Sequence, residues 1–396
     1  MSYEDVPLED YQEEQTAVSG SMAGKILKMF IILFLAVIAV LAIMNIERLT
    51  PENIAHWFQY DLLGKTEGSG YPVNFVGSAV SDGNFDVISG VPIYCSDTTI
   101  AVLNQNAGTY QETQHSFASP VMSVNGGYAI IYNIDATGYS IVKRDSVIHT
   151  SSVKQRICAA DVSSGGVYAI LTKSNDYLSS LTVYRSDNLE KYKYSFADYY
   201  MNTVSINNDG SRAVLTGVSA RNGGLTSVIY VLDFSEDSYI RKYEVDDTFI
   251  YSVKYLDNGC AFCVGNNKAF YIDIGDDKKT DIDYESRTLT AYTLSRSRGA
   301  VLALSKNPDG RECDLVAYDK SGNLLCDIKT GKKVVSADMK NGRYAILTPE
   351  EIVVYDGDGN KKSGAKTDTD AKKIIFTDNS SFYVLGKSMI SHIFAE

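Results

Sequence analysis

A motif of one turn and one strand recurs along the chain at intervals of roughly 40 residues, and it restricts the fold more than any other feature. Each copy is a turn rich in Gly, Asn or Asp followed by a strand of the Tyr-Ala-Ile-Leu type, and the copies begin at Gly126, Gly165, Asp209, Asn258, Arg298, Asn341 and Asp378. In four units a further strand matches, at 181–184, 227–230, 315–319 and 352–356. Short strands with this period are typical of the blades of a β-propeller, which bury their apolar faces against one another.

The repeats predict how the ring is built and closed. An earlier unit begins near Asn84, which gives about eight units, and the final unit is one strand short. The segment Pro72–Val76 can supply that strand from the N-terminal side. We therefore predict an all-β fold, a β-propeller of seven or eight four-stranded blades with eight favoured, over residues 71–396. A pair of β-sandwiches is the alternative architecture.

One apolar segment precedes the repeats and is long enough to cross a bilayer. It runs from Ile26 to Ile46, and a spanning helix needs about 20 mostly apolar residues. Lys25 and Lys28 lie on its N-terminal side, which favours a cytoplasmic N-terminus although Arg48 follows the span. We predict a single transmembrane helix at 26–46 acting as a signal anchor, with the bilayer as partner. A cleaved signal peptide fits less well, because the leading region is long and acidic.

The anchor predicts the arrangement of the flanking segments. Residues 1–25 form an acidic, disordered cytoplasmic tail, and the propeller lies outside the cytoplasm at the cell membrane. Residues 47–70 form a juxtamembrane amphipathic helix and linker, because apolar residues recur at helical spacing after a cap at Thr50 and Pro51. Trp57 on the apolar side of this helix is expected to anchor it at the membrane surface, with packing under the propeller as the alternative.

The overall composition excludes one class of partner and leaves another open. The net charge of −12 argues against nucleic acid, whose binding depends on Lys and Arg. The chain holds 28 Tyr and one Trp. Tyr is favoured in half-buried strand positions, and this is the simplest explanation. An aromatic surface that binds carbohydrate or peptide is the alternative.

The sequence contains no set of residues that specifies a reaction. The four His residues are scattered, no nucleophile elbow or phosphate-binding loop is present, and no catalytic, cofactor-binding or metal-binding residue is predicted. Asp356–Asn360 resembles the start of a calcium loop but lacks its later ligands, so a solvated hairpin turn is expected.

The six cysteines are predicted to be mostly structural. Cys260 and Cys263 form a Cys-x-x-Cys pair inside a strand, where buried thiols are expected rather than a redox pair. Cys95 and Cys158 are expected in the core. Cys313 and Cys326 lie on consecutive strands, so a disulfide between them is geometrically conceivable in an oxidising exterior.

Two stretches carry a resemblance to a known family. They are Leu49–Trp57 leading into Gly70–Val73, and Ser119–Tyr132 with Tyr177–Tyr184 after it. The chain resembles an uncharacterised bacterial family of single-pass, membrane-anchored, propeller-like proteins, a domain of unknown function. This resemblance implies architecture and location only, since the family offers no catalytic residues. The repeats are also loosely similar to quinoprotein-like and WD-like propellers, but the turn at Asp327–Lys332 lacks the usual Trp, and no Trp-Asp pair occurs.

Three functions are compatible with these features. The first is a non-enzymatic scaffold that binds a protein or an envelope polymer outside the cytoplasm. The second is a cell-envelope hydrolase or lactonase with a site at the propeller channel, which would need titratable groups from several blades. The third is a ligand sensor that signals through the transmembrane helix to the acidic tail. One fold hosts many functions, so the fold alone does not rank them.

Overall fold

The computed structural model describes Met29, residues 68–221 and residues 223–396 of the chain. The predictions for the tail, the transmembrane helix at 26–46 and most of the juxtamembrane segment lie outside the described residues. Within the described residues, no helix has the length and apolarity that a membrane span requires.

The described chain folds into eight four-stranded antiparallel sheets, here called blades 1 to 8 in chain order. Blade 1 comprises β2 (Val80–Ile88), β3 (Val91–Ser96), β4 (Thr99–Leu103) and β5 (Thr109–Gln114), and blade 2 comprises β6 (Pro120–Asn125), β7 (Tyr128–Asn133), β8 (Gly138–Lys143) and β9 (Val147–Ser152). Blade 3 comprises β10 (Ile157–Val162), β11 (Tyr168–Lys173), β12 (Ser179–Tyr184) and β13 (Glu190–Phe196), and blade 4 comprises β14 (Tyr200–Ile206), β15 (Arg212–Arg221), β16 (Gly224–Asp233) and β17 (Tyr239–Asp246).

The last four blades follow the same order. Blade 5 comprises β18 (Ile250–Tyr255), β19 (Cys260–Gly265), β20 (Lys268–Asp273) and β21 (Lys278–Asp283), and blade 6 comprises β22 (Thr288–Ser295), β23 (Gly299–Ser305), β24 (Cys313–Tyr318) and β25 (Leu324–Lys332). Blade 7 comprises β26 (Ser336–Lys340), β27 (Arg343–Leu347), β28 (Glu351–Tyr355) and β29 (Lys361–Lys366), and blade 8 comprises β30 (Lys373–Asp378), β31 (Ser381–Leu385), β32 (Met389–Phe394) and β1 (Val73–Asn74).

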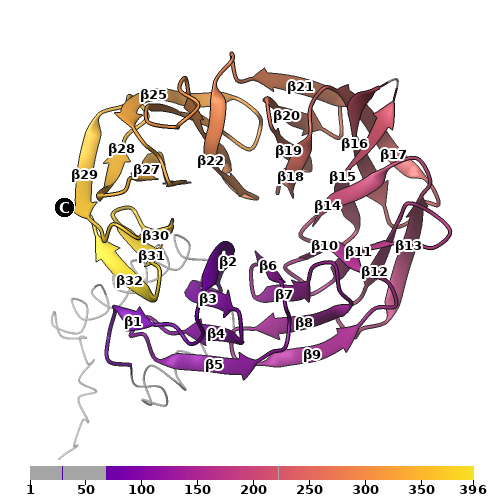
Figure 1. The fold of residues 1–396 in the computed structure, drawn as a ribbon, viewed down its shortest axis with the longest axis horizontal. Helices are drawn as coiled ribbons and strands as arrows, with labels where there is room; N and C mark the ends of the chain where they lie inside the picture. The colour runs from indigo at the N-terminus through magenta and orange to yellow at the C-terminus, as the bar shows by residue number, and fades with distance from the viewer. Residues whose placement is uncertain (1–28, 30–67, 222) are drawn as a thin grey trace, which may run out of the picture. The chain divides into compact units, whose positions relative to one another are not determined.

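The blades of residues 68–396 are arranged as a closed ring (Figure 1). The first strand of each blade lies innermost and contacts the first strand of the next, and β30 of blade 8 contacts β2 of blade 1. One apolar cluster lies between each pair of consecutive blades, including the pair formed by blades 8 and 1. The predicted propeller is therefore confirmed, and it has eight blades rather than seven.

The burial of each strand explains why the repeats were visible in the sequence. The second and third strands of a blade are covered on both faces by neighbouring blades, so they read as continuous apolar runs. For example, β19 and β23 are buried at every position. The outer strands face solvent on one side, and β9 alternates between half-buried and exposed residues along its whole length.

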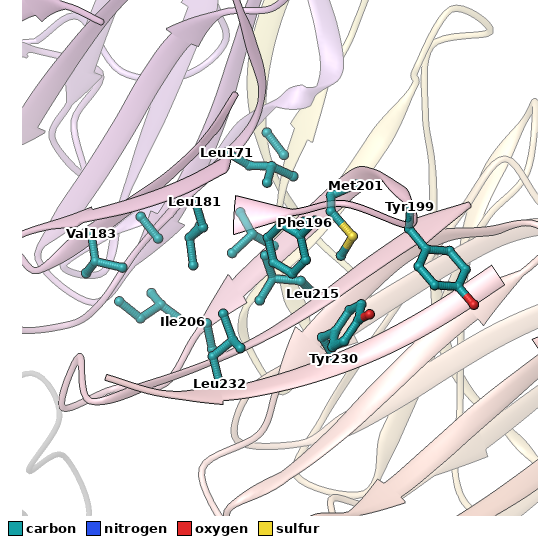
Figure 2. Close-up of a cluster of buried hydrophobic side chains, with 14 of the residues drawn as sticks. Leu171, Leu181, Val183, Phe196, Tyr199, Met201, Ile206, Leu215, Tyr230 and Leu232 are labelled. Carbon is teal, nitrogen blue, oxygen red and sulfur yellow. The ribbon is translucent and has the colours of Figure 1, made fainter. Parts of the chain in front are cut away.

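The cluster between blades 3 and 4 shows how two blades interlock (Figure 2). Leu171, Leu181 and Phe196 come from blade 3 and meet Leu215 and Tyr230 of blade 4. The rings of Phe196 and Tyr230 are 5.3 Å apart. Such close contacts mean that no blade buries its apolar surface alone.

The N-terminal strand closes the ring, as predicted. Val73 lies opposite Ile390 and Asn74 lies opposite Met389, so β1 is the outer strand of blade 8. Only these two residues form the strand, which is shorter than the predicted Pro72–Val76. Phe75 continues the pairing by donating its N–H to the Ser388 carbonyl at 3.2 Å.

Gly299, the first residue of β23, is expected to be sensitive to substitution. Its φ is +108°, and a Cβ at this position would lie 2.2 Å from the Tyr318 carbonyl oxygen. We expect Gly299→Ala to lower the free energy of unfolding by about 2 kcal/mol or more, because both the backbone strain and the clash must be relieved. Gly259→Ala is the control, since its φ of +81° is similarly strained but no atom lies within 4 Å of the added methyl. Urea unfolding of the full chain in detergent, followed by circular dichroism, measures the stability of both variants. Equal losses of unfolding free energy would contradict a clash at Gly299.

Candidate functional site

Charged side chains from five blades gather around the inner strands. They are Asp86 on β2, Asp161 on β10, Lys254 on β18, Arg296 directly after β22, and Lys373 on β30. Lys254 interacts electrostatically with each of the other four. This central charge cluster is the strongest candidate for a site in the described residues, because charged groups rarely enter the interior unless they are paired or used.

Asp161 is the most buried member, with a side chain only 2% exposed. Its carboxylate accepts four hydrogen bonds from three other blades: from Ser123 Oγ at 2.6 Å, Ser205 Oγ at 3.0 Å, the Ile206 N–H at 2.9 Å and Arg296 Nη2 at 2.5 Å. Burial by itself would raise the pKa of Asp161. The positive charges of Arg296 and Lys254, together with the hydrogen bonds, outweigh burial and hold this pKa below its usual range.

Arg296 links blade 6 to blades 3, 4 and 5. Besides its ion pair with Asp161, its Nη1 donates to the Ile206 carbonyl at 2.5 Å and to the Tyr255 carbonyl at 3.3 Å. Its own carbonyl accepts the Asp257 N–H at 2.9 Å. The Arg296 side chain thus spans several inner strands at the end where they turn into the second strands.

A second buried carboxylate repeats this arrangement on the other side of the ring. Asp338 on β26 accepts the Phe376 N–H of blade 8 at 2.9 Å and forms an ion pair with Arg298 at 3.3 Å. Asp161 likewise accepts a backbone N–H from the following blade. Buried Asp side chains on inner strands therefore join consecutive blades.

Lys254 is the member of the cluster that lacks a partner. Its ammonium group forms no ion pair and no hydrogen bond with any residue in the described part of the chain, and the side chain is half-buried. Burial lowers the pKa of Lys254, and Arg296 and Lys373 lower it further, while Asp161 and Asp86 oppose the shift. An unpaired ammonium in this position can attract an anionic group.

We expect Lys254→Met to stabilise the protein at pH 7 by about 1 kcal/mol, because it removes a desolvated charge and keeps the volume. The folded-state pKa of Lys254 lies below its unfolded value of about 10.4, so the unfolded chain binds more protons between the two values. Stability of the wild type should therefore rise with pH through this window, and the variant should lose that rise. Urea unfolding between pH 7 and pH 10 measures both effects. If Lys254→Met were less stable than the wild type at pH 7, the Lys254 ammonium would have a stabilising partner after all.

The residues predicted from the sequence do not form a common site. Lys25, Lys28 and Trp57, the predicted membrane anchor, lie outside the described residues. The structure does not bring Cys313 and Cys326 together: Cys326 lies opposite Ala317, four residues along β24 from Cys313, and both thiols are free. Four residues along a strand span about 13 Å, which is beyond the reach of a disulfide.

The remaining candidates behave as structural residues. Cys260 and Cys263 are buried in β19, and burial raises the pKa of both thiols. Cys95 is buried and its pKa is raised to about 12, whereas Cys158 is only half-buried. Asp356 begins the turn between β28 and β29 and accepts the Asn360 N–H at 2.9 Å, as expected for a hairpin turn.

One pair, Cys95 and His115, resembles a nucleophile and its base. The Cys95 Sγ lies 3.4 Å from His115 Nε2. His115 Nδ1 accepts the Phe117 N–H at 3.1 Å, so the ring proton is on Nε2 and is directed to the Ser96 carbonyl at 3.1 Å. This tautomer cannot take a proton from the thiol.

Within the central charge cluster, Asp161 and Arg296 are engaged in contacts between blades. In the residues that the structure describes, no three His, Cys, Asp or Glu side chains gather as metal ligands would. The best-placed carboxylate, Asp161, already accepts four hydrogen bonds and cannot also serve as a general base. The sequence analysis did not predict the central charge cluster. One signal was present: a single charged residue inside an otherwise apolar inner strand, such as Asp161 in Ile157–Val162.

Residues 68–393 match the family of unknown function DUF5711, and the chain belongs to this family. The predicted resemblance to such a family is thereby confirmed. No curated protein has a significantly similar sequence.

Solved structures similar to this chain are β-propellers. BamB from Moraxella catarrhalis aligns with a TM-score of 0.52 and 12% identity over 81% of this chain and 99% of BamB. The C-terminal WD40 domain of Sif2 aligns with a TM-score of 0.56 and 10% identity over 83% of this chain and 98% of that domain. Sqt1 from Saccharomyces cerevisiae aligns with a TM-score of 0.55 and 10% identity over 83% of this chain and 99% of Sqt1. At these identities the likeness shows the fold alone.

Proposed function

We propose that this DUF5711 chain is a non-enzymatic scaffold, a membrane-anchored propeller displayed outside the cytoplasm that binds a protein or an envelope polymer. The observation that carries the proposal is the use made of the central charge cluster. Asp161 and Arg296 of this cluster, and Asp338 outside it, form hydrogen bonds that hold blades together, so these three charged groups are structural. A rigid ring with loops on both faces then remains as a surface for binding.

The membrane attachment in this proposal rests on the apolar segment 26–46 and its flanking lysines. A protease added to intact cells should digest the propeller if it lies outside, while a tag on residues 1–25 stays protected. Protection of the propeller with digestion of the tag would reverse the orientation. Release of the whole protein by an alkaline wash would refute the anchor.

The binding role is tested by crosslinking in intact cells with a reagent that does not enter the cytoplasm, followed by mass spectrometry. We expect the same envelope protein or polymer in repeated experiments, attached at the same propeller loops. A control chain with residues 1–67 alone, which lacks the ring, should recover nothing in common with it. No recurrent partner, together with turnover of an envelope substrate that is lost in Lys254→Met, would favour the hydrolase instead.

A further inference from the structure

Blade 8 has an outer edge that its own outer strand covers only in part. The outer strands of the other seven blades are six to nine residues long, whereas β1 has two. β32 has six residues, and β1 lies along only Met389 and Ile390. Figure 1 shows β1 as a short arrow beside β32, where the other blades have long outer strands. In the described part of the chain, no strand pairs with the outer side of Ser391–Phe394, which we call the open edge.

The hydrogen bonds around β32 show which backbone groups the open edge presents. Met389 accepts the Gly386 N–H at 2.8 Å, and Ala395 donates to the Ser380 carbonyl at 2.7 Å, so the odd-numbered residues of β32 face β31. Ser388 instead accepts the Phe75 N–H on the outer side. By this alternation the N–H and C=O groups of His392 and Phe394 point outward, and the described residues make no backbone hydrogen bond to them.

The preceding residues of the same chain turn away from the open edge. If β1 extended backward, Tyr71 would lie opposite His392. Instead, the Gly70 N–H donates to the Asn106 carbonyl at 3.0 Å and the Tyr71 hydroxyl donates to the Asn104 carbonyl at 2.9 Å. Both acceptors belong to the turn between β4 and β5 of blade 1, so the Gly70 backbone and the Tyr71 hydroxyl are tied to blade 1, while the Tyr71 ring stays 6.0 Å from His392.

Aromatic side chains line one face of the open edge. The His392 ring lies 4.7 Å from Phe394 and 6.0 Å from Tyr71, and we call these three residues the aromatic shelf. Tyr383, 4.9 Å from His392, is only 2% exposed and supports the shelf from the core. Phe394 is 66% exposed, the highest value of any large apolar side chain in the propeller residues described. An added strand would place every second side chain against this shelf, where cross-strand aromatic and apolar pairs are stabilising.

A second copy of the chain does not fit the open edge. Antiparallel pairing of two copies through both outward residues would place His392 of each copy opposite Phe394 of the other. The same register would place Glu396 of the second copy opposite Ile390, where Val73 already lies. The Glu396 carbonyl is also occupied, since it accepts the Gly364 N–H of β29 at 3.0 Å.

We propose that an extended segment of a partner polypeptide adds to blade 8 as its outer strand along Ser391–Phe394. The segment hydrogen bonds to the backbone of His392 and Phe394 and places apolar side chains, two residues apart, on the aromatic shelf. This proposal rests on the proposed binding function and names how the partner binds. The residue of the segment that meets His392 or Phe394 cannot be Pro, because it must donate an N–H.

Amide hydrogen exchange of the full chain in detergent micelles tests the open edge without any ligand. We expect fast exchange at His392 and Phe394 and exchange at least tenfold slower at Ser391 and Ile393, whose amides face β31. Slow exchange at all four would mean that another part of the chain or a second copy already covers the edge, and it would overturn the proposal.

A peptide with the sequence of β13, Glu190–Phe196, is a suitable probe, because Tyr192, Tyr194 and Phe196 alternate along it as the shelf requires. We expect the acetylated, amidated peptide to bind at millimolar concentration or below and to slow exchange at His392 and Phe394. Two N-methylated peptides are compared, one methylated at the odd-numbered positions and the other at the even-numbered positions. Binding should be abolished in the peptide whose methylated amides face β32 and should be unchanged in the other. Absence of binding, or equal binding of both methylated peptides, would overturn the proposal.

Variants of the full chain locate the binding. His392→Pro removes an outward N–H that no described residue uses, and it should abolish binding, while Phe394→Ala should weaken it about tenfold. Leu324→Ala is the matched control, since Leu324 is 58% exposed on β25, far along the chain from the shelf, and it should change nothing. If crosslinking in cells recovers a partner equally well with His392→Pro, the scaffold function holds but this edge is not where it binds.

Discussion

Arg296→Ala is expected to lower the free energy of unfolding by about 3 kcal/mol, although the residue lies in a turn. The substitution leaves the Asp161 carboxylate buried without its main positive partner, and a buried unpaired charge is more costly than the lost contact itself. It also frees the carbonyls of Ile206 and Tyr255, which Arg296 joins across blades 4 and 5. Urea unfolding of the full chain in detergent, followed by circular dichroism, measures the loss.

Arg298→Ala is the matched control for this substitution. Arg298 also pairs with a buried carboxylate, but its side chain is 32% exposed whereas that of Arg296 is 10% exposed. Water can therefore replace part of the lost pairing, and the loss should be about half as large. Combining Arg296→Ala with Asp161→Leu should cost less than the sum of the two single changes, because the buried carboxylate that Arg296→Ala leaves without its ion pair is removed as well. Additive losses would contradict the pairing.

The charge on Asp161 also determines how the free energy of unfolding changes at acid pH. Its folded-state pKa lies below its unfolded value of about 3.9, so its contribution is complete above that value and is lost as the pH falls through the folded-state pKa. The wild type should lose stability below about pH 4 more steeply than Arg296→Ala, in which the carboxylate is no longer held in the charged form by Arg296.

The fold was predictable from the sequence because its signals are local. A Gly or Asn marks the start of each second strand, and full burial makes β19 and β23 read as apolar runs of similar length. The closing strand was predictable for a different reason: the last unit is one strand short, and a ring leaves no other place for the missing strand.

The central charge cluster was not predictable in the same way. Asp161 and Arg296 are 135 residues apart, and nothing near either residue in the chain indicates that they meet. Their pairing follows from the curvature of the whole ring, which places the turn of blade 6 against the inner strand of blade 3. The same limit applies to Cys313 and Cys326: adjacent strands were predicted correctly, but a bulge and the strand register decide which residues lie opposite one another.

The open edge of blade 8 follows from the shortness of β1, which the sequence also did not show. The apolar pattern of Pro72–Val76 predicts a strand of ordinary length, whereas the structure ends the pairing at Val73. The hydrogen bonds of Gly70 and Tyr71 to the β4–β5 turn of blade 1 compete with strand pairing, and they involve residues more than 30 positions along the chain. Because β1 is short, few strand contacts hold the N-terminal segment to blade 8.

Phe75→Ala is therefore expected to cost about 3 kcal/mol and to loosen blade 8 before the rest of the ring. The Phe75 side chain is 7% exposed, and its ring lies 5.9 Å from Tyr94 in the apolar cluster between blades 8 and 1. Truncation leaves a cavity where the first and last blades meet. Amide exchange at Ile390, which pairs with Val73, should accelerate more than exchange at Ile170 in the fully paired blade 3.

Val76→Ala is the control, because this neighbouring side chain is 43% exposed and its backbone N–H keeps its hydrogen bond to the Tyr94 hydroxyl at 3.0 Å. It should change the free energy of unfolding by no more than about 0.5 kcal/mol. If Phe75→Ala accelerated exchange equally in blades 3 and 8, the ring would open as one unit, and β1 would not be the part that opens first. Faster exchange confined to blade 8 would instead show that the two residues of β1 depend on Phe75 to hold the ring closed.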